Sequence, residues 1–295
     1  MTTSKYSLLL ACALLNPAWA QAAAVQADHI EAELIAERTA LQPGADNWVA
    51  LRLKPETGWH VYWQNPGDTG LATKLAWTLP DGITAGAIEW PYPQLQQQRD
   101  LTNYGYDHET LHLVPVTVAE NFGAKTATLK AQAKWLVCSD VCIPGKADLA
   151  LDLPVGGEAK PDPRWMEKFA QARTQLPQAP PGWEQQFSTD HGDLTLRLSG
   201  ADAAFSRASK IEFFPVANDA VNHHAPQRIA LDNDHTLRLT QQQSTYYVPH
   251  STLRGVLVLH GAGDNGTRAY AIDAQPGAVL PVSADGAVKK AADPG

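Results

Sequence analysis

Hydrophobic and polar residues alternate along much of the chain, in short runs separated by turn-forming residues. In the clearest run, residues 127–137, apolar residues occupy every second position: Ala127, Leu129, Ala131, Ala133, Trp135 and Val137. Successive side chains of a β-strand point to opposite faces, so this alternation predicts a strand with one face in a hydrophobic core.

Similar runs predict strands throughout the chain. They cover residues 48–53, 59–63, 75–79, 111–118, 194–198, 211–216, 237–240, 246–248, 256–260 and 269–272. Turn-forming clusters such as residues 43–46, 65–68 and 80–82 separate several of them. Many short strands with frequent turns are typical of β-sandwiches, and no internal repeat indicates a solenoid or propeller.

The length of 295 residues exceeds the usual size of one domain. Residues 156–182 are rich in proline, and Pro163 can open a short helix over about 164–175. We therefore expect an all-β protein in which two β-sandwich domains are joined by a partly helical linker. The expected parts are a signal peptide at 1–20, a first sandwich at 27–155, the linker at 156–182, a second sandwich at 183–283 and a disordered tail at 284–295.

The first twenty residues have the three parts of a secretory signal peptide. Lys5 supplies positive charge, residues 6–15 are mainly apolar, and Ala18-Trp19-Ala20 matches the small-x-small cleavage pattern. Without a twin arginine, this segment predicts Sec export to a bacterial periplasm. Cys12 lies in a sequence that loosely resembles a lipobox; the alternative is that it is apolar filler, discarded with the signal.

Composition and motifs exclude several classes of function. The formal net charge of −8 argues against nucleic acid or an anionic membrane surface as a partner. No run after the signal approaches the 18 apolar residues of a membrane-spanning helix, so we expect no transmembrane segment in this chain. The sequence also lacks a glycine-rich phosphate loop, a paired zinc-ligand motif and a G-x-S-x-G elbow.

Cys138 and Cys142 follow the alternating run and are the only cysteines besides Cys12. In an oxidising compartment such a pair can form a structural disulfide, exchange electrons with other thiols or bind the soft ion Cu(I). Continued alternation places Cys138 on the solvent-directed face with Lys130 and Lys134. A bulge at Leu136, which interrupts the alternation, would reverse this placement.

Chain geometry limits how the two cysteines can bond. In an extended strand, residues four apart are separated by about 13 Å, whereas a disulfide needs Cα atoms within about 7 Å. Residues 139–141 must therefore form a turn. Closing a loop of about five residues stabilises a fold by only about 2 kcal/mol, which favours thiol–disulfide exchange over a structural role.

The histidines offer weaker candidates for metal binding. His223 and His224 are adjacent, so on a strand they point to opposite faces. Four others could in principle join the cysteines in a copper site, but their spacing matches no ligand motif: His29, His60, His108 and His112. Surface or core polar roles are expected for all six.

Four motifs in order carry a resemblance to a known family. They are GWHVYWQNPGD at 58–68, WP at 90–91, NYGY at 103–106 and WLVCSDVCIP at 135–144. Together they resemble the N-terminal periplasmic region of the copper-sensitivity suppressor ScsB, a relative of the thiol:disulfide interchange protein DsbD. The resemblance spans roughly residues 27–155 and continues more weakly through the second domain.

This resemblance implies a fold and a function. The first domain would be an immunoglobulin-like sandwich in which Cys138 and Cys142 relay electrons. The source would be a transmembrane thiol-reductase domain, on the same or a separate chain, and the acceptors would be periplasmic thioredoxin-fold proteins. The chain would then be a protein-disulfide reductase component, incomplete without that membrane domain and needing no cofactor. The alternative is a periplasmic copper-tolerance module in which the same cysteines bind Cu(I).

Site residues follow from the resemblance position by position. Cys138 and Cys142 match the redox pair, and Tyr62 matches an aromatic residue near the active site. Asn103 and Tyr104 align with a cap loop that shields the cysteines in the family.

The match is incomplete at the cap. A phenylalanine preceded by two acidic residues is expected there, and this chain has Leu101, Thr102 and Asn103. Trp135 and Asp140 are further candidates to line the site. Which cysteine attacks a partner stays open: the outward register favours Cys138, whereas the resemblance favours the second cysteine, Cys142.

Overall fold

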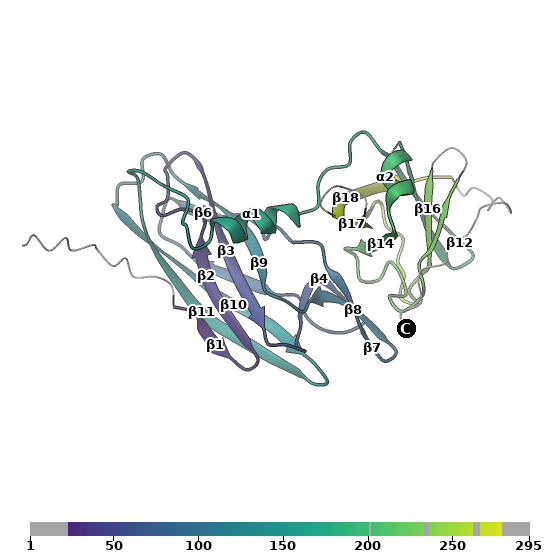
Figure 1. The fold of residues 1–295 in the computed structure, drawn as a ribbon, viewed down its shortest axis with the longest axis horizontal. Helices are drawn as coiled ribbons and strands as arrows, with labels where there is room; N and C mark the ends of the chain where they lie inside the picture. The colour runs from purple at the N-terminus through teal and green to yellow at the C-terminus, as the bar shows by residue number, and fades with distance from the viewer. Residues whose placement is uncertain (1–22, 201, 233–235, 262–265, 279–295) are drawn as a thin grey trace, which may run out of the picture.

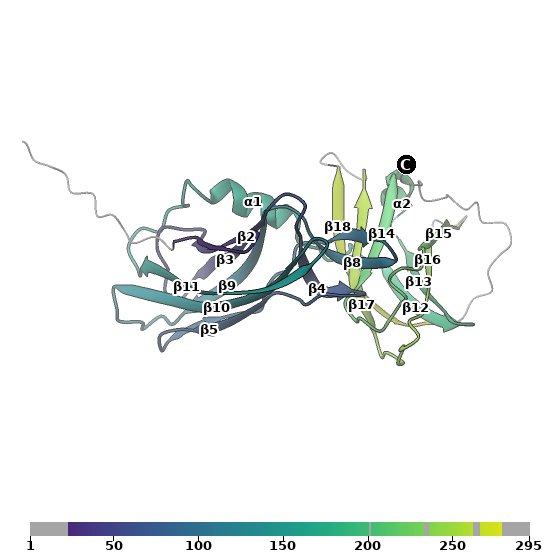
Figure 2. The same ribbon diagram turned by 90° about the horizontal axis from the view of Figure 1, so that it is seen from below.

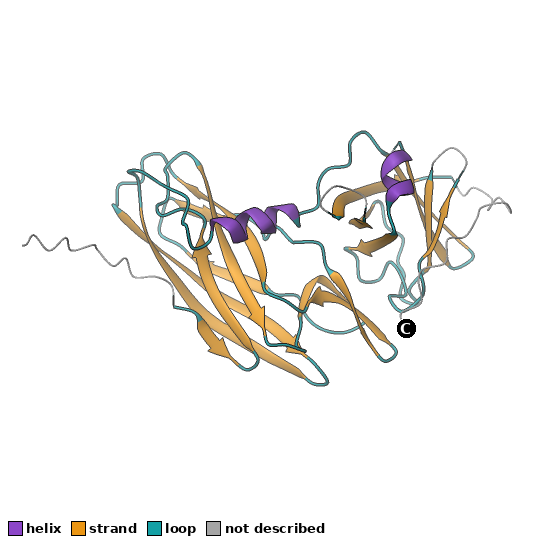
Figure 3. Ribbon diagram, viewed as in Figure 1, coloured by secondary structure: helices purple, strands orange, loops and turns teal. Residues whose placement is uncertain are grey.

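A computed structural model describes residues 23–200, 202–232, 236–261 and 266–278. The predicted signal peptide, with Cys12, and the predicted tail at 284–295 lie outside these residues. Nearly all the regular secondary structure of the described chain is strand, with two short helices (Figure 3). The prediction of an all-β protein with sandwich-like domains is confirmed.

The first domain is a sandwich of two antiparallel sheets. One sheet has the order β1-β2-β3-β9-β6, with the bounds Val25–Ala27, Ile30–Ala36, Asp46–Pro55, Thr110–Val118 and Ile83–Ala85. The other has the order β11-β10-β5, with the bounds Cys142–Pro154, Thr126–Cys138 and Lys74–Thr78. Leu34 and Leu51 from the first sheet share one hydrophobic core with Leu129 and Leu151 from the second.

Strands β10 and β11 form a long hairpin that carries both cysteines at its tip. They pair without a register shift from Thr126 opposite Pro154 to Cys138 opposite Cys142. Buried positions alternate along β10 as the sequence predicts, from Ala127 to Val137. Because the register is unbroken, Leu136 introduces no bulge.

A third, smaller sheet adjoins the tip of this hairpin. Its order is β4-β8-β7, with the bounds Val61–Gly67, Leu101–Tyr106 and Gln94–Gln98. In two perpendicular views it lies between the sandwich and the second domain (Figures 1 and 2). His60, just before β4, pairs with Cys138 at the end of β10. The small sheet is thereby fixed next to the cysteines.

Helix α1 (Met166–Thr174) lies within the segment predicted to be helical and covers the five-stranded sheet. Phe169 and Ala172 are buried against Ala50 and Leu113 of that sheet. The linker that contains α1 is therefore packed onto the first domain.

The described residues of the second domain form seven strands and one short helix. Its strand order is β14-β17-β18-β12-β13-β16-β15, with the bounds Lys210–Pro215, Leu253–His260, Thr267–Pro276, Glu184–Asp190, Asp193–Ser199, Leu237–Gln242 and Arg228–Leu231. Helix α2 covers Asp202–Arg207. Residues such as Leu196, Leu239 and Leu257 form a separate hydrophobic core.

One predicted strand of this domain, at 246–248, is wrong. The backbone N–H of Tyr247 donates to the carbonyl of Ser244, which makes a turn. The side chains of Tyr246 and Val248 are exposed, so these residues do not pack against a sheet.

The two domains meet through the small sheet. Phe214 of β14 packs edge-on against Trp63 and Tyr104 and belongs to the core of the first domain. Asn65 donates a hydrogen bond of 2.7 Å to the carbonyl of Pro215. Asn218 donates to the side-chain oxygen of Asn65 at 3.0 Å and to the carbonyl of Gly67 at 2.7 Å. Buried aromatic contacts and directional hydrogen bonds thus hold β4 and β8 against the second domain.

Candidate redox site

The tip of the β10–β11 hairpin carries a disulfide. The Cα atoms of Cys138 and Cys142 are 4.1 Å apart and their sulfur atoms are bonded at 2.08 Å. The backbone N–H of Ser139 donates to the carbonyl of Val141 at 3.0 Å, which closes the loop. The turn that chain geometry requires at residues 139–141 is therefore formed.

The two cysteines differ sharply in exposure. Cys138 is 0% exposed, whereas Cys142 is exposed and its neighbour Val141 is 60% exposed. The expectation that Cys138 points outward into solvent is wrong. Only Cys142 can be approached by a large partner without opening the structure.

The reason lies in His60, just before β4, rather than in β10. The unbroken register leaves Cys138 on the same face as Lys134, as the alternation predicts. At the end of β10, however, His60 exchanges two backbone hydrogen bonds with Cys138, each of 2.9 Å. Residues paired in this way carry their side chains on the same face, so His60 lies beside Cys138. A segment distant in the sequence thus helps to close a face that alternation alone leaves open.

Tyr62 is the predicted site residue that the structure brings to the disulfide. Its hydroxyl lies 3.7 Å from Sγ of Cys142 and is the donor, because a disulfide sulfur carries no hydrogen. Gly70 packs on the ring so closely that an added Cβ would lie 2.3 Å from a ring carbon. Burial raises the pKa of Tyr62, so the phenol stays protonated and can donate at neutral pH.

Gln98 is a contact of the cysteine loop that the sequence did not reveal. It ends β7, and its Nε2 donates to the carbonyl of Ser139 at 2.5 Å. The β7–β8 hairpin is thereby attached to the loop. Gln98 is one of several glutamines in this segment, and no local pattern distinguishes it from the others.

Asn103 and Tyr104, which align with a cap loop, make their polar contacts elsewhere. The side-chain oxygen of Asn103 accepts hydrogen bonds from the backbone N–H of Thr69 at 2.9 Å and from its hydroxyl at 3.1 Å. The hydroxyl of Tyr104 lies 2.9 Å from Nδ1 of His223 in the second domain. Both residues are buried in β8, where they stabilise the small sheet and its contact with the second domain.

Trp135 and Asp140 lie on different sides of the hairpin. Trp135 is buried on the core face of β10, the face opposite Cys138, and its indole covers Gly145. Asp140 is exposed in the loop between the cysteines. Trp135 therefore supports the hairpin from within, and Asp140 faces any molecule that approaches Cys142.

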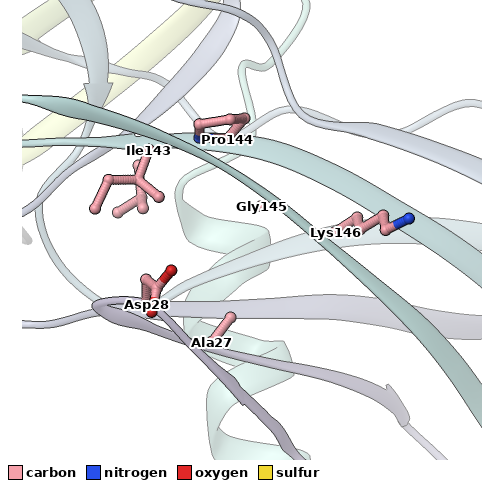
Figure 4. A pocket seen from close by; sticks show the side chains of 7 residues that line it. Ala27, Asp28, Ile143, Pro144, Gly145 and Lys146 are labelled. Atoms are coloured by element: carbon pink, nitrogen blue, oxygen red, sulfur yellow. The ribbon is translucent and has the colours of Figure 1, made fainter.

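A hollow of about 250 Å³ lies beside the same hairpin (Figure 4). It is lined by Ala27, Asp28, Val137, Ile143, Pro144, Gly145 and Lys146. Neither cysteine lines it. The disulfide is thus a surface site at the hairpin tip, separate from this hollow.

Within the part of the chain that the structure describes, no group of three or more His, Cys, Asp or Glu side chains is arranged to hold a metal ion. His223 and His224 contact different partners, Tyr104 and Thr102. The same residues contain no helix long and apolar enough to span a membrane.

A β-sandwich that presents a disulfide at a hairpin tip, with one cysteine buried and the other exposed, has the features of a thiol–disulfide interchange domain. The comparison with protein families agrees. Residues 31–154 match the model of the N-terminal region of the thiol:disulfide interchange protein DsbD. This segment is similar to the N-terminal region of DsbD, in agreement with the resemblance found in the sequence motifs.

One solved structure extends the likeness in fold to the second domain. The N-terminal periplasmic domain of ScsB from Proteus mirabilis superposes with a TM-score of 0.58 at 18% identity, covering 86% of this chain and 98% of that one. Spo0M, a sporulation control protein from Bacillus subtilis, has a TM-score of only 0.21 at 7% identity, covering 83% of this chain and 90% of that one. A search of curated protein sequences finds no significant match.

Proposed function

We propose that this protein is a periplasmic thiol–disulfide interchange domain that relays electrons through Cys138 and Cys142. The observation that carries the proposal is the asymmetry of the pair, with Cys142 exposed at the hairpin tip and Cys138 buried behind it. An accessible sulfur can meet a partner, and a sheltered sulfur next to it can resolve the bond that forms.

The position of the disulfide supports exchange over a structural role. It joins residues that thirteen-residue strands already hold together in register. Strands β10 and β11 are also fixed by a shared hydrophobic core. The bond adds about 2 kcal/mol to a hairpin that has other means of stability.

The relay consists of two exchange steps. In the reduced domain the Cys142 thiolate attacks a partner disulfide, forms a mixed disulfide and releases one partner thiolate. The Cys138 thiol then loses its proton and attacks Sγ of Cys142, which releases the second partner thiolate and restores the Cys138–Cys142 disulfide. Two electrons pass to the partner, whose two thiolates take up protons.

Partners and location follow from the family likeness. The electron source would be a transmembrane thiol-reductase domain, and the acceptors would be thioredoxin-fold oxidoreductases of the periplasm. The periplasmic assignment is supported by the matched domain of ScsB, which is described as periplasmic. The chain would thus be one component of a protein-disulfide reductase, and no cofactor besides the cysteine pair is needed.

Trapping the mixed disulfide tests the proposal. Cys138→Ser leaves Cys142 without its resolving partner, so incubation with an oxidised thioredoxin-fold protein should accumulate a covalent adduct that dithiothreitol removes. The matched Cys142→Ser variant, which keeps only the buried sulfur, should form much less adduct. If neither folded variant forms an adduct, the relay is refuted. Tight one-to-one binding in a Cu(I) titration of the reduced protein would then favour the copper alternative.

A further inference from the structure

His60 lies next to the sulfur that must ionise in the second exchange step. Its backbone N–H and carbonyl are both bonded to Cys138, at 2.9 Å each. The Cβ atoms of such a pair are about 5.5 Å apart on a shared face, within reach of an imidazole and a thiol. The ring also meets Tyr62 edge-on at 5.1 Å, and Tyr62 contacts Cys142.

One ring nitrogen of His60, Nε2, makes no hydrogen bond. His60 is only 8% exposed, and its Nε2 is buried without a hydrogen-bond partner in the disulfide form. A buried nitrogen with no partner is costly, so a state of the site that supplies a partner is favoured. Reduction of the disulfide creates such a partner, the thiol of Cys138.

The protonation state suits proton acceptance. Burial lowers the pKa of His60, so its imidazole is neutral at pH 7. The charged and titratable groups around it are Asp107, whose charge partly opposes this shift, the phenol of Tyr62 and the two cysteines. A neutral imidazole can take a proton from a thiol, and the imidazolium then stabilises the thiolate.

We propose that His60 is the proton acceptor for Cys138 in the resolving step of the relay, an assignment that rests on the proposed function. The Cys138 S–H proton moves to Nε2 of His60 as the thiolate forms. This thiolate attacks Sγ of Cys142, the bond between Cys142 and the partner breaks, and the partner sulfur leaves with the electron pair. The imidazolium then gives its proton to the leaving thiolate or to water.

The two exchange steps can be followed separately with Ellman's reagent. Attack by Cys142 on the reagent releases one thionitrobenzoate at a rate proportional to reagent concentration. Attack by Cys138 on the resulting mixed disulfide releases a second, at a rate independent of concentration. Stopped-flow measurements across pH would be made on wild type, His60→Phe and His60→Gln. His112→Phe serves as a matched control, because His112 of β9 is also buried but packs against Trp90 and Tyr106 instead of the cysteines.

The expected result is selective. Both His60 variants should slow the second phase about tenfold or more at neutral pH and leave the first phase within about twofold of wild type. In the variants the second phase should fall about tenfold for each pH unit below the thiol pKa, whereas wild type should fall less steeply. His112→Phe should change neither phase.

Other outcomes separate the two proposals. An unchanged second phase and pH profile in folded His60→Phe and His60→Gln would overturn the role of His60. Loss of the first phase in wild type would instead contradict the relay itself. His60→Gln keeps a polar side chain of moderate size, so it guards against a result that reflects only altered packing.

Discussion

Reduction of the Cys138–Cys142 bond should lower stability only slightly. The bond closes a loop of five residues, and the loop-entropy relation gives about 2 kcal/mol for such a loop at 25 °C. Cys138 is 0% exposed, and a free cysteine behaves as a small apolar residue, so its thiol can stay in the same place. For a chain of this size, 2 kcal/mol corresponds to a fall of about 4–8 °C in Tm.

Urea unfolding of the oxidised and the dithiothreitol-reduced protein measures this difference. Tryptophan fluorescence is a suitable signal because Trp63 and Trp135 lie in the core of the first domain. The urea dependence should be the same in both forms, and a Cys138→Ala/Cys142→Ala variant should match the reduced form within about 1 kcal/mol. If reduction lowered the free energy of unfolding by more than about 5 kcal/mol, the reasoning would be refuted, because the disulfide would then be a main source of the stability of the fold.

Three further predictions address exposure, domain contact and pH. In the reduced protein Cys142 should react with N-ethylmaleimide at least about tenfold faster than Cys138, because only Cys142 is accessible; equal labelling by peptide mass spectrometry would contradict this. Asn218→Ala removes two hydrogen bonds to the small sheet and should cost about 1–3 kcal/mol in urea unfolding. Alanine at half-buried Asn222, whose side-chain hydrogen bonds lie at the surface, should cost less. Burial lowers the pKa of His112 to about 4, so between pH ~6.5 and ~4 the unfolded chain binds a proton that the native state excludes. Stability should therefore fall by up to about 3 kcal/mol as pH drops through this range and be fully present above it. His112→Phe should flatten that decline, and an unchanged pH dependence of unfolding would exclude His112 as its source.

The amino-acid sequence by itself determined the elements that depend on local pattern. Alternation predicted β10 and the face of each of its residues, because side chains of a strand point alternately to either side whatever lies around them. Backbone dimensions alone predicted the turn between Cys138 and Cys142, because an extended chain would hold their Cα atoms too far apart to bond. The motifs around the cysteines were specific enough to indicate the family that residues 31–154 match.

Only the tertiary structure decided what covers each face. Cys138 is buried on a face that His60, from a distant part of the sequence, helps to close by pairing with the end of β10. Gln98 contacts the cysteine loop because the fold brings β7 next to the tip of the β10–β11 hairpin. Tyr104 contacts the second domain because His223 and Phe214 lie there. Alternation assigns a residue to a face, but exposure depends on which distant segments pack against that face. Those contacts cannot be predicted from the local sequence pattern.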